Sequence, residues 1–322
     1  MDSKTAERRA PHHPRVEDDA LLRGAGHFVA DRSEPRQALG VFVRSPHAFA
    51  RIGAIDIAQA RRAPGVLAVL TAADMEAAGV GNVGRHPPLV GRGGKKLIIP
   101  HRPALARERV MHVGEPVAMV IAETLAAAQD AAELVQVSYE ELAPVIDLIA
   151  AAREDAPQLW PEAPGNLAID WPGLAADPDA NAREVDRILA SAPHVARVKV
   201  PNQRLIVATM EPRGATAIYD AATDVTTLRT CSQSAGALRE NILAIMSWPK
   251  ERLRVITEDV GGAFGLKSGA YPEYLTAMVG ARLTGRPVHW MSSRSEAFLT
   301  DNQGRDTFTE AELALDAKGR FL

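Results

Sequence analysis

The sequence predicts an α+β fold of mixed α/β character, on two kinds of evidence. Continuous apolar runs of strand length occur at Val66–Leu70 and Val117–Ala122, as is typical of strands buried on both faces. Apolar residues at helical spacing occur at Thr124–Val135 and Pro272–Thr284. Pro272 at the start of the second helix and Gly285 just after it mark the limits of that helix.

Length and composition set the class of protein. The 322 residues correspond to two domains at about 150 residues each. With 37 basic and 40 acidic residues the net charge is −3, which excludes the basic surface typical of nucleic-acid binding. One cysteine excludes a disulfide scaffold and an iron–sulfur cluster held by four thiolates. We expect no membrane span and no secretory signal, because long apolar runs are missing, and therefore a cytoplasmic location.

Composition divides the chain into four parts. These are a polar N-terminal arm (1–19), a first α/β domain (20–148), a connecting segment rich in Ala, Pro, Asp and Asn (149–192), and a second domain (193–322). His12 and His13 in the arm could bind a metal, but paired histidines in a polar tail are more often solvated. We therefore predict no metal site there.

The elements of the first domain follow from local signals. Its predicted strands and helices are, in order, strand Gly40–Arg44, helix Asp56–Ala63, strand Val66–Leu70, helix Thr71–Ala78, strand Val117–Ala122, helix Thr124–Val135 and strand Val135–Tyr139. Between the second and third strands, residues 81–103 are rich in Gly, Pro and basic residues. A loop of this length in a compact domain is often functional or a docking segment.

The second domain is predicted in the same way. Its elements are strand Val195–Val200, a hairpin of Ala215–Tyr219 and Val225–Arg229, helix Gly236–Trp248, strand Leu253–Val260, helix Pro272–Thr284, strand Val288–Met291 and the alternating strand Phe308–Leu315. Asp316–Gly319 then has the composition of a type I turn, and three residues follow it. A return strand this short indicates either half of a larger protein or a covered domain end, and we favour the first.

A glycine-rich loop, Gly261–Gly265, joins a predicted strand to a predicted helix. Its glycines allow a tight turn and let an anionic ligand approach the backbone amides and the start of the next helix. A tight strand–helix turn without a ligand remains an equal interpretation. Nucleotide binding is disfavoured because Leu266 stands between Gly265 and Lys267-Ser268, so the P-loop spacing fails by one residue.

Two further motifs carry polar side chains. Gln233, between a strand and a helix, is free to donate and accept hydrogen bonds, although an ordinary helix start explains it too. The neighbouring Cys231 is predicted to be a small buried side chain. In Met210–Gly214, Glu211 either pairs with Arg213 or acts as a base, and we favour pairing.

Together these motifs resemble the molybdenum-binding large subunit of the xanthine dehydrogenase, aldehyde oxidase and carbon monoxide dehydrogenase family, in its N-terminal half. The matching stretches are Arg15–Asp18, Leu21–Gly24, Gly26–Phe28, Arg44–Ala48, Pro64–Val66, Gly114–Ala118, Met210–Gly214, Ser232-Gln233 and Asp259–Lys267. The resemblance covers nearly the whole chain after the arm. It implies an α/β hammerhead domain followed by an incomplete first molybdopterin-binding domain.

The resemblance also implies roles for site residues. Gln233 falls where the family has a glutamine near the molybdenum oxo group, a catalytic and cofactor-binding position. The cofactor-lining loop falls on Gly261, Gly262, Ala263, Phe264 and Gly265, where Ala263 replaces a glycine that is frequent in the family. Lys267 occupies a position that is often basic, and we assign it no role.

The implied function is that of a molybdenum hydroxylase. Such an enzyme oxidises an aldehyde, an N-heterocycle or a similar small-molecule substrate with water as the oxygen source. The implied partners are the second half of the large subunit, which supplies a second cofactor-binding domain and a glutamate base, an iron–sulfur small subunit and an FAD medium subunit. The molybdenum–molybdopterin cofactor is then shared with a partner chain, and this chain alone is inactive. The alternative is a non-catalytic fragment or assembly module of the same fold.

Overall fold

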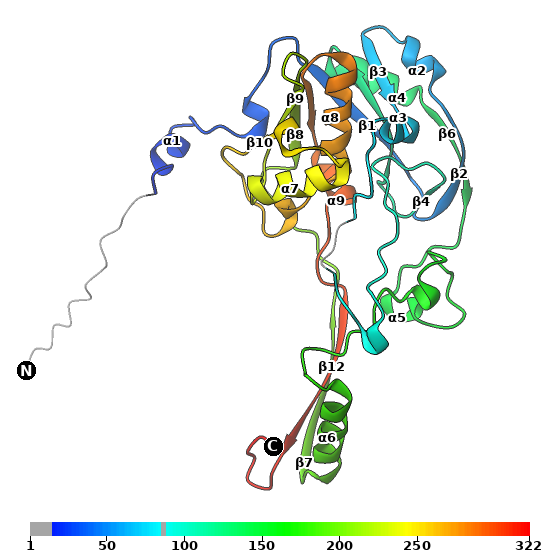
Figure 1. Cartoon of the computed structure of the whole chain (residues 1–322), viewed down its shortest axis with the longest axis vertical. Coiled ribbons are helices and arrows are strands. Elements are labelled where there is room, and N and C mark those ends of the chain that lie inside the picture. The colour runs from blue at the N-terminus through cyan, green and yellow to red at the C-terminus, as the bar shows by residue number, and fades with distance from the viewer. Residues whose placement is uncertain (1–14, 85–87) are drawn as a thin grey trace, which may run out of the picture.

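The computed structural model describes residues 15–84 and 88–322. Most of the predicted N-terminal arm, with His12 and His13, therefore lies outside the described residues. The described part consists of a body that contains a large β-sheet and of a long two-stranded ribbon that projects from it (Figure 1). Helix α1 (Asp18–Leu22) lies away from the body, and no residue in it is buried.

The body is organised around one seven-stranded sheet. Its strands, in spatial order, are β10 (Leu253–Ile256), β9 (Val225–Thr230), β8 (Gly214–Asp220), β11 (Val288–Met291), β1 (Ala38–Arg44), β5 (Pro116–Ala122) and β3 (Val66–Leu70). β1 pairs in parallel with β11, with Ala38 opposite Val288. A single sheet therefore contains strands from both predicted domains, which share one hydrogen-bonded layer rather than forming two separate bodies.

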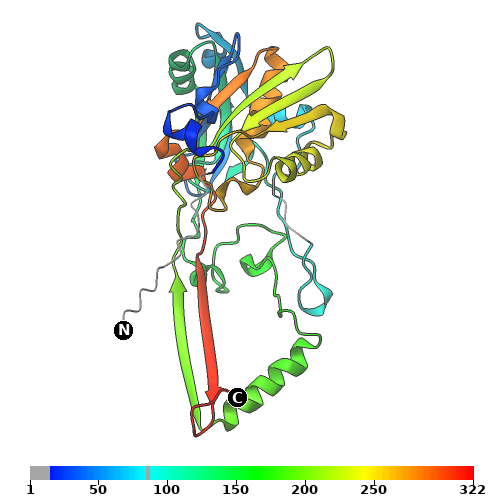
Figure 2. The same cartoon turned by 90° about the vertical axis from the view of Figure 1, so that its left-hand side faces the viewer.

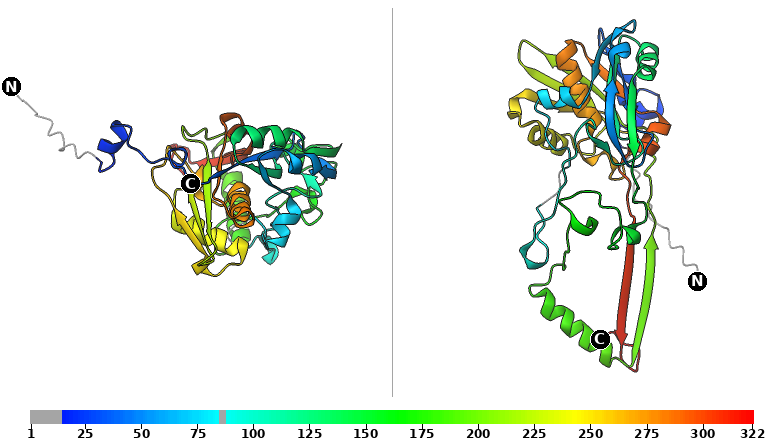
Figure 3. Two further views of the ribbon diagram at one scale, coloured as in Figure 1. Left: turned by 90° about the horizontal axis from the view of Figure 1, so that it is seen from above. Right: turned by 90° about the vertical axis from the view of Figure 1, so that its right-hand side faces the viewer.

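Strand β5 is buried by helices on both faces of the sheet. All seven of its residues are buried, as its continuous apolar sequence predicts. Met119 and Ile121 belong to the core cluster of helix α8 (Pro272–Thr284), while Val120 and Ala122 belong to the cluster of helix α4 (Leu125–Glu133). Viewed from above, α8 and α4 lie on opposite sides of the strands (Figure 3).

The strand directions create one functional edge of the sheet. β9 and β10 are parallel neighbours, β11 and β1 are parallel neighbours, and β8 is antiparallel to both β9 and β11. Strands β10, β9, β11 and β1 therefore all run in the same direction, and their carboxyl ends lie at one edge of the sheet. The amino end of β8 lies at that edge too. Loops that follow such carboxyl ends are the usual ligand-binding segments of open sheets.

The remaining elements pack around this sheet. They are the small sheet of β4 (Arg109–Val110), β2 (Ala50–Asp56) and β6 (Gln136–Glu141), and the helices α2 (Ala58–Arg62), α3 (Ala72–Ala77), α5 (Leu148–Ala151), α7 (Ala235–Met246) and α9 (Arg294–Thr300). The predicted hairpin is confirmed, because β8 and β9 pair around a turn that begins after Asp220. No helix within residues 15–84 and 88–322 is long and apolar enough to cross a bilayer.

The sequence analysis missed one long helix. α6 (Pro178–Ser191) lies in the segment that its Ala, Pro, Asp and Asn content indicated as a connection between domains, with no helix predicted there. The local signals for a helix are nevertheless present, because the side chain of Asp177 accepts a hydrogen bond from the Ala180 amide and Pro178 occupies the first turn. Strand β10 also differs from its prediction: it ends at Ile256 rather than at Val260.

The ribbon consists of β7 (His194–Asn202) and β12 (Thr307–Leu315), paired antiparallel along their full lengths (Figure 2). Its two faces differ in chemistry. One face carries the cross-strand ion pairs Arg197–Glu312 and Lys199–Glu310. The other face carries exposed apolar side chains, which are Val198, Val200 and Leu313. The predicted turn after β12 is present, and a bridge between Leu315 and Phe321 begins the return strand.

Candidate functional site

The two predicted site segments meet because they follow parallel neighbouring strands. β9 leads into residues 231–234, and β10 leads into the glycine loop. The Gln233 amide donates to the Lys267 carbonyl at 3.0 Å, and Ser232 Oγ donates to the same carbonyl at 3.3 Å. The backbone of Gln233 therefore lies beside the segment that directly follows the Gly261–Gly265 loop.

The loop has a backbone that favours glycine. Gly262 has a φ of 98°, Gly265 a φ of 93° and Phe264 a φ of 48°, all in the left-handed region. At Gly261 the reason is space instead, since a Cβ there would lie 2.5 Å from Cβ of Glu211. Leu266 donates to the Ala263 carbonyl at 2.9 Å and closes the turn.

Four successive amides of this loop remain available. Among the described residues, the N–H groups of Gly262, Ala263, Phe264 and Gly265 donate to no protein acceptor. A Cβ built on Gly265 would meet no atom within 4 Å, so open space lies beside the turn. Gln233 is exposed, and its carboxamide makes no hydrogen bond within residues 15–84 and 88–322. Free donors beside open space are suited to an anionic ligand with several acceptor atoms.

The predicted contribution of a helix start to this loop is wrong. The loop is followed by the 3-10 turn Leu266–Ser268, and α8 begins only at Pro272. The first turn of α8 carries the buried carboxylate of Glu273, which bonds to Arg213. Loop amides, rather than a helix dipole, are therefore the anion-binding feature here.

The predicted pairing of Glu211 with Arg213 is also wrong. Glu211 pairs with Lys267, whose Nζ donates to Oε2 of Glu211 at 2.9 Å. Oε2 also accepts from the Gly261 amide at 2.9 Å, and Oε1 accepts from the Val29 amide at 3.3 Å. Both oxygens already accept from protein donors, which argues against the alternative that Glu211 acts as a base. Glu211 and Arg213 thus each pair with a residue that is distant in the sequence.

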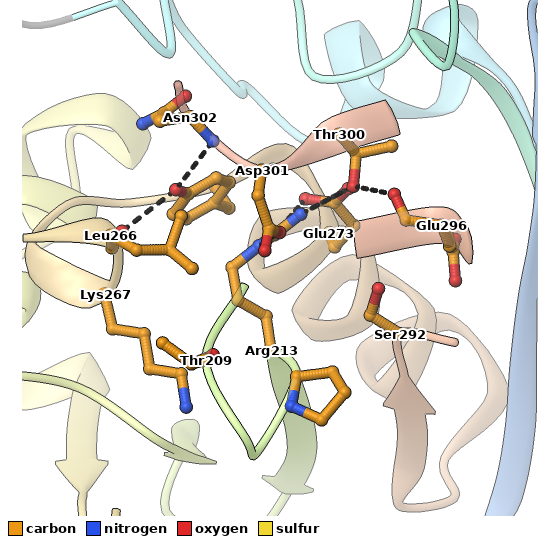
Figure 4. Close-up of polar contacts among 12 residues, drawn as sticks. Thr209, Arg213, Leu266, Lys267, Glu273, Ser292, Glu296, Thr300, Asp301 and Asn302 are labelled. Carbon is orange, nitrogen blue, oxygen red and sulfur yellow. Dashed lines mark hydrogen bonds and ion pairs between the residues drawn. The ribbon is translucent and has the colours of Figure 1, made fainter. Parts of the chain in front are cut away.

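Arg213 instead organises a second buried cluster (Figure 4). Its guanidinium, fully buried, donates to Glu273 at 2.9 Å and to Asp301 at 2.6 Å. It also lies 3.7 Å from the ring centre of Tyr271, a favourable cation–π distance. Arg44, at the carboxyl end of β1, bonds to the same Glu273 at 2.9 Å. The cluster therefore ties the first half of the chain to α8 beside the site.

The charges in this cluster stabilise one another. Burial acts to raise the pKa of Glu273, but Arg213 and Arg44 overcome this and lower it to about 2. Burial likewise opposes the charge of Arg213, yet Glu273 holds the pKa of that guanidinium above its usual value. Burial raises the pKa of Tyr271 to about 12, so its hydroxyl stays protonated and donates to the Leu266 carbonyl at 2.9 Å. The 3-10 turn after the loop is thereby held to the cluster.

The chemistry of the donors limits what the site can hold. No group of three or more His, Cys, Asp or Glu side chains among the described residues could bind a metal ion directly. Cys231 is buried, as predicted, and burial raises its thiol pKa, so it is a poor thiolate ligand. Amide donors and a carboxamide fit a metal carried by an organic anionic ligand, which contacts the protein through acceptor atoms.

The site is open on its outer side. Phe264 is 83% exposed and Met210 is 89% exposed. Large apolar side chains that are exposed together often mark a contact surface for another molecule. A separate cavity of about 1020 Å³ lies at residues 97–115, partly within the predicted long loop, and is lined by Trp160, Arg204, Phe298 and others. Gln233 and the glycine loop do not line that cavity, so the two features are distinct.

Sequence reasoning missed the residues that hold this site together. Glu211 was paired with the wrong partner, Lys267 was given no role, and Glu273 and Asp301 were not singled out. One signal was present: Glu273 lies at the start of a helix whose first ten residues are mainly apolar or aromatic and are all buried, and a charge buried there needs a partner. Nothing in the sequence identified which cation that partner is.

Comparison with known proteins covers almost the whole chain. Residues 169–322 match the family described as molybdopterin cofactor-binding domain. Residues 23–143 match the family described as aldehyde oxidase and xanthine dehydrogenase, a/b hammerhead domain. The nicotine 6-hydroxylase large subunit of Paenarthrobacter nicotinovorans is 33% identical over 96% of this chain and 36% of its own length. The carbon monoxide dehydrogenase large chain of Afipia carboxidovorans is 33% identical over 96% of this chain and 38% of its own.

Solved structures agree with these matches. Quinoline 2-oxidoreductase from Pseudomonas putida 86 superposes with a TM-score of 0.82 at 35% identity, over 96% of this chain and 37% of that chain. Reconstituted CO dehydrogenase from Oligotropha carboxidovorans gives a TM-score of 0.82 at 32% identity, over 96% and 38%. The chain thus spans little more than a third of the relatives that it matches. The chain therefore combines an aldehyde oxidase and xanthine dehydrogenase hammerhead domain with a following molybdopterin cofactor-binding domain, and over 96% of its length it is similar to the large subunits of nicotine 6-hydroxylase and carbon monoxide dehydrogenase.

Proposed function

We propose that this chain forms part of a molybdopterin-dependent oxidoreductase, in which Gln233 and the loop Gly261–Gly265 form one wall of the cofactor site. The observation that carries the proposal is a set of four loop amides and a nearby carboxamide that find no hydrogen-bond partner in the described part of the chain. Preorganised amides and side-chain amides are the donors that proteins use to hold anionic groups. When bound, the cofactor supplies the redox centre, and this chain supplies the donors that orient it.

The roles of individual residues follow from their geometry. The N–H groups of residues 262–265 donate to acceptor atoms of the cofactor, and the Gln233 carboxamide donates beside them. Gly265 leaves the approach open because it has no side chain. Since Glu211 is occupied by Lys267 and Gly261, we do not assign it as the proton acceptor for the reaction and propose that the partner polypeptide supplies that group.

The opposite wall of the site is proposed to lie on the part of the large subunit that this chain does not contain. Phe264 and Met210 are exposed at the loop, and Val198, Val200 and Leu313 form an uncovered apolar ribbon face. The chain spans only 36–38% of the length of these relatives. We propose that a polypeptide carrying the remaining part covers both surfaces and supplies the second cofactor-binding domain and a glutamate base.

The substrate and the electron acceptors follow by the same reasoning. The relatives include enzymes named for nicotine, quinoline and carbon monoxide. We propose a small molecule, an aldehyde, an N-heterocycle or a similar compound, hydroxylated with water as the oxygen source. Electrons then pass to an iron–sulfur subunit and an FAD subunit. The cytoplasmic location stays a prediction, which cell fractionation tests.

The test compares two matched glycines in the native complex purified through this chain. Gly265 and Gly285 both have positive φ, and a Cβ on either meets nothing within 4 Å, so G265A and G285A both strain the backbone without a steric clash; the urea midpoint of each variant reports that strain separately from the cofactor content. Molybdenum and pterin content per complex is measured for each. We expect G265A to lose most of the cofactor and G285A to retain it. Equal retention in both variants contradicts the proposal.

The alternative, a non-catalytic fragment or assembly module, predicts a different result for the wild-type chain. It predicts that the chain purifies folded, without a partner polypeptide and without molybdenum. Co-purification of molybdenum with a second large-subunit polypeptide excludes this alternative. The exposed apolar ribbon face favours the enzyme, because a two-stranded ribbon is only marginally stable without a covering layer.

A further inference from the structure

The ion pair between Glu211 and Lys267 is buried beside the proposed cofactor wall. The side chain of Lys267 is fully buried and that of Glu211 is 8% exposed. Lys267 Nζ donates to Oε2 of Glu211 and also to the Glu211 carbonyl, both at 2.9 Å. A lysine almost never occurs fully buried unless it is paired, because desolvation penalises its charge.

Each partner of this pair also bonds to one segment of the site. The Glu211 carboxylate accepts from the Gly261 amide at 2.9 Å, and the Glu211 amide donates to the Gly261 carbonyl at 3.0 Å. The backbone carbonyl of Lys267 accepts from the Gln233 amide at 3.0 Å. Through these bonds, one ion pair connects the first residue of the glycine loop to the residue that bears the free carboxamide.

Global stability alone does not account for such a pair. Replacing a buried ion pair with apolar groups of similar volume is often neutral or stabilising. The ion pair differs from an apolar contact because its charge-assisted hydrogen bonds are directional. They hold Gly261 and Lys267, at the two ends of the loop, in defined positions. The contact between Gly261 and Cβ of Glu211 restricts the loop further, since no side chain fits between them.

We propose that Glu211 and Lys267 are positioning residues, which set the spacing between the free loop amides and the Gln233 carboxamide. This inference rests on the proposed function, since the spacing matters only if both groups contact one ligand. Neither residue touches the ligand in this proposal. Both act through Gly261 and Gln233.

The experiment uses the double variant E211Q/K267M in the full chain. The substitutions remove both charges and keep similar side-chain volumes, so neither partner is left as an unpaired buried charge. Hydrogen–deuterium exchange is followed at the single amides of Gly261 and Gln233, and the urea midpoint reports global stability. The control is K199M/E310Q, which removes an exposed ion pair of the ribbon.

We expect exchange at Gly261 and Gln233 to become at least tenfold faster in E211Q/K267M, with little change in the urea midpoint and no change in the control. Molybdenum content of the native complex is expected to fall in parallel. Unchanged exchange at both amides overturns the proposal. So does a uniform acceleration of all protected amides with a lower midpoint, which is the signature of a purely structural pair.

The two proposals fail in different measurements. If exchange accelerates at both amides while molybdenum content stays unchanged, the positioning role is overturned. The proposed cofactor wall is judged separately, by the comparison of G265A with G285A, which leaves Glu211 and Lys267 in place. Exchange reports the geometry of this chain and does not depend on enzyme activity.

Discussion

The buried cluster around Arg213 allows a prediction with a defined pH signature. In R213M the guanidinium that bonds to Glu273 and Asp301 is lost, and both carboxylates remain buried. Removing one partner of a buried ion pair typically destabilises by about 3–5 kcal/mol. Native proteins typically have a free energy of unfolding of about 5–15 kcal/mol, so R213M is expected to be much closer to unfolding at pH 7 than the wild type.

The pH dependence identifies the mechanism. In the native protein the pKa of Glu273 is lowered from 4.5 to about 2. A difference of one in pKa corresponds to about 1.36 kcal/mol, so ionised Glu273 contributes about 3 kcal/mol to the free energy of unfolding. Because the pKa in the folded state is the lower one, this contribution is complete above pH 4.5. It is lost as the pH falls from 4.5 towards 2.

The assay is urea unfolding of wild type and R213M at several pH values between 7 and 2.5. The wild type is expected to lose more stability than R213M below pH 4.5, because Arg44 alone remains beside Glu273 in the variant. R197M, which breaks an exposed pair on the ribbon, is the control and is expected to change stability by about 0.5 kcal/mol or less. Parallel pH curves for wild type and R213M refute the reasoning.

Three further predictions concern the site and the ribbon. G261A places a Cβ 2.5 Å from Cβ of Glu211, so it is expected to lower the free energy of unfolding, measured in urea, by about 1–3 kcal/mol. G236A in α7 is the control: its new Cβ meets no atom within 4 Å, and it is expected to be neutral or stabilising. Q233A removes an exposed side chain and is expected to leave stability within about 0.5 kcal/mol while molybdenum content falls; unchanged molybdenum content contradicts its role. V198D, on the exposed apolar ribbon face, is expected to reduce co-purification of the partner polypeptide without unfolding the chain, and full recovery of the partner excludes this face as the contact.

Several elements could be predicted because their causes are local. The helix α8 has Pro272 at its start and Gly285 at its C-cap, with φ of 62° at that glycine. The hairpin of β8 and β9 and the buried strand β5 likewise follow from turn residues and apolar runs within a few residues of one another. The glycine loop was identified for the same reason, since its backbone conformation is encoded by its own residues.

Long-range pairings were decided by the tertiary structure. The sequence offers 37 basic and 40 acidic side chains, and chemistry alone does not select Lys267 for Glu211, 56 residues away, or Asp301 for Arg213, 88 residues away. From the sequence alone, Arg213 was chosen as the partner of Glu211 because it is only two residues away. In the structure the two side chains pair with different residues. The pairing of β1 with β11, which brings strands from both halves into one sheet, is equally invisible to any local pattern.

The sequence by itself therefore determined the locally encoded elements, such as α8, β5 and the β8–β9 hairpin, together with the tight glycine turn, and it identified Gln233 and Gly261–Gly265 as polar site segments. The tertiary structure decided that these groups lie side by side, because parallel β9 and β10 end at the same edge of the sheet. It also decided which buried charges neutralise one another. The physical reason is that periodicity and turn chemistry act over a few residues, whereas the desolvation of a charge is compensated by whichever opposite charge the folded chain brings within bonding distance.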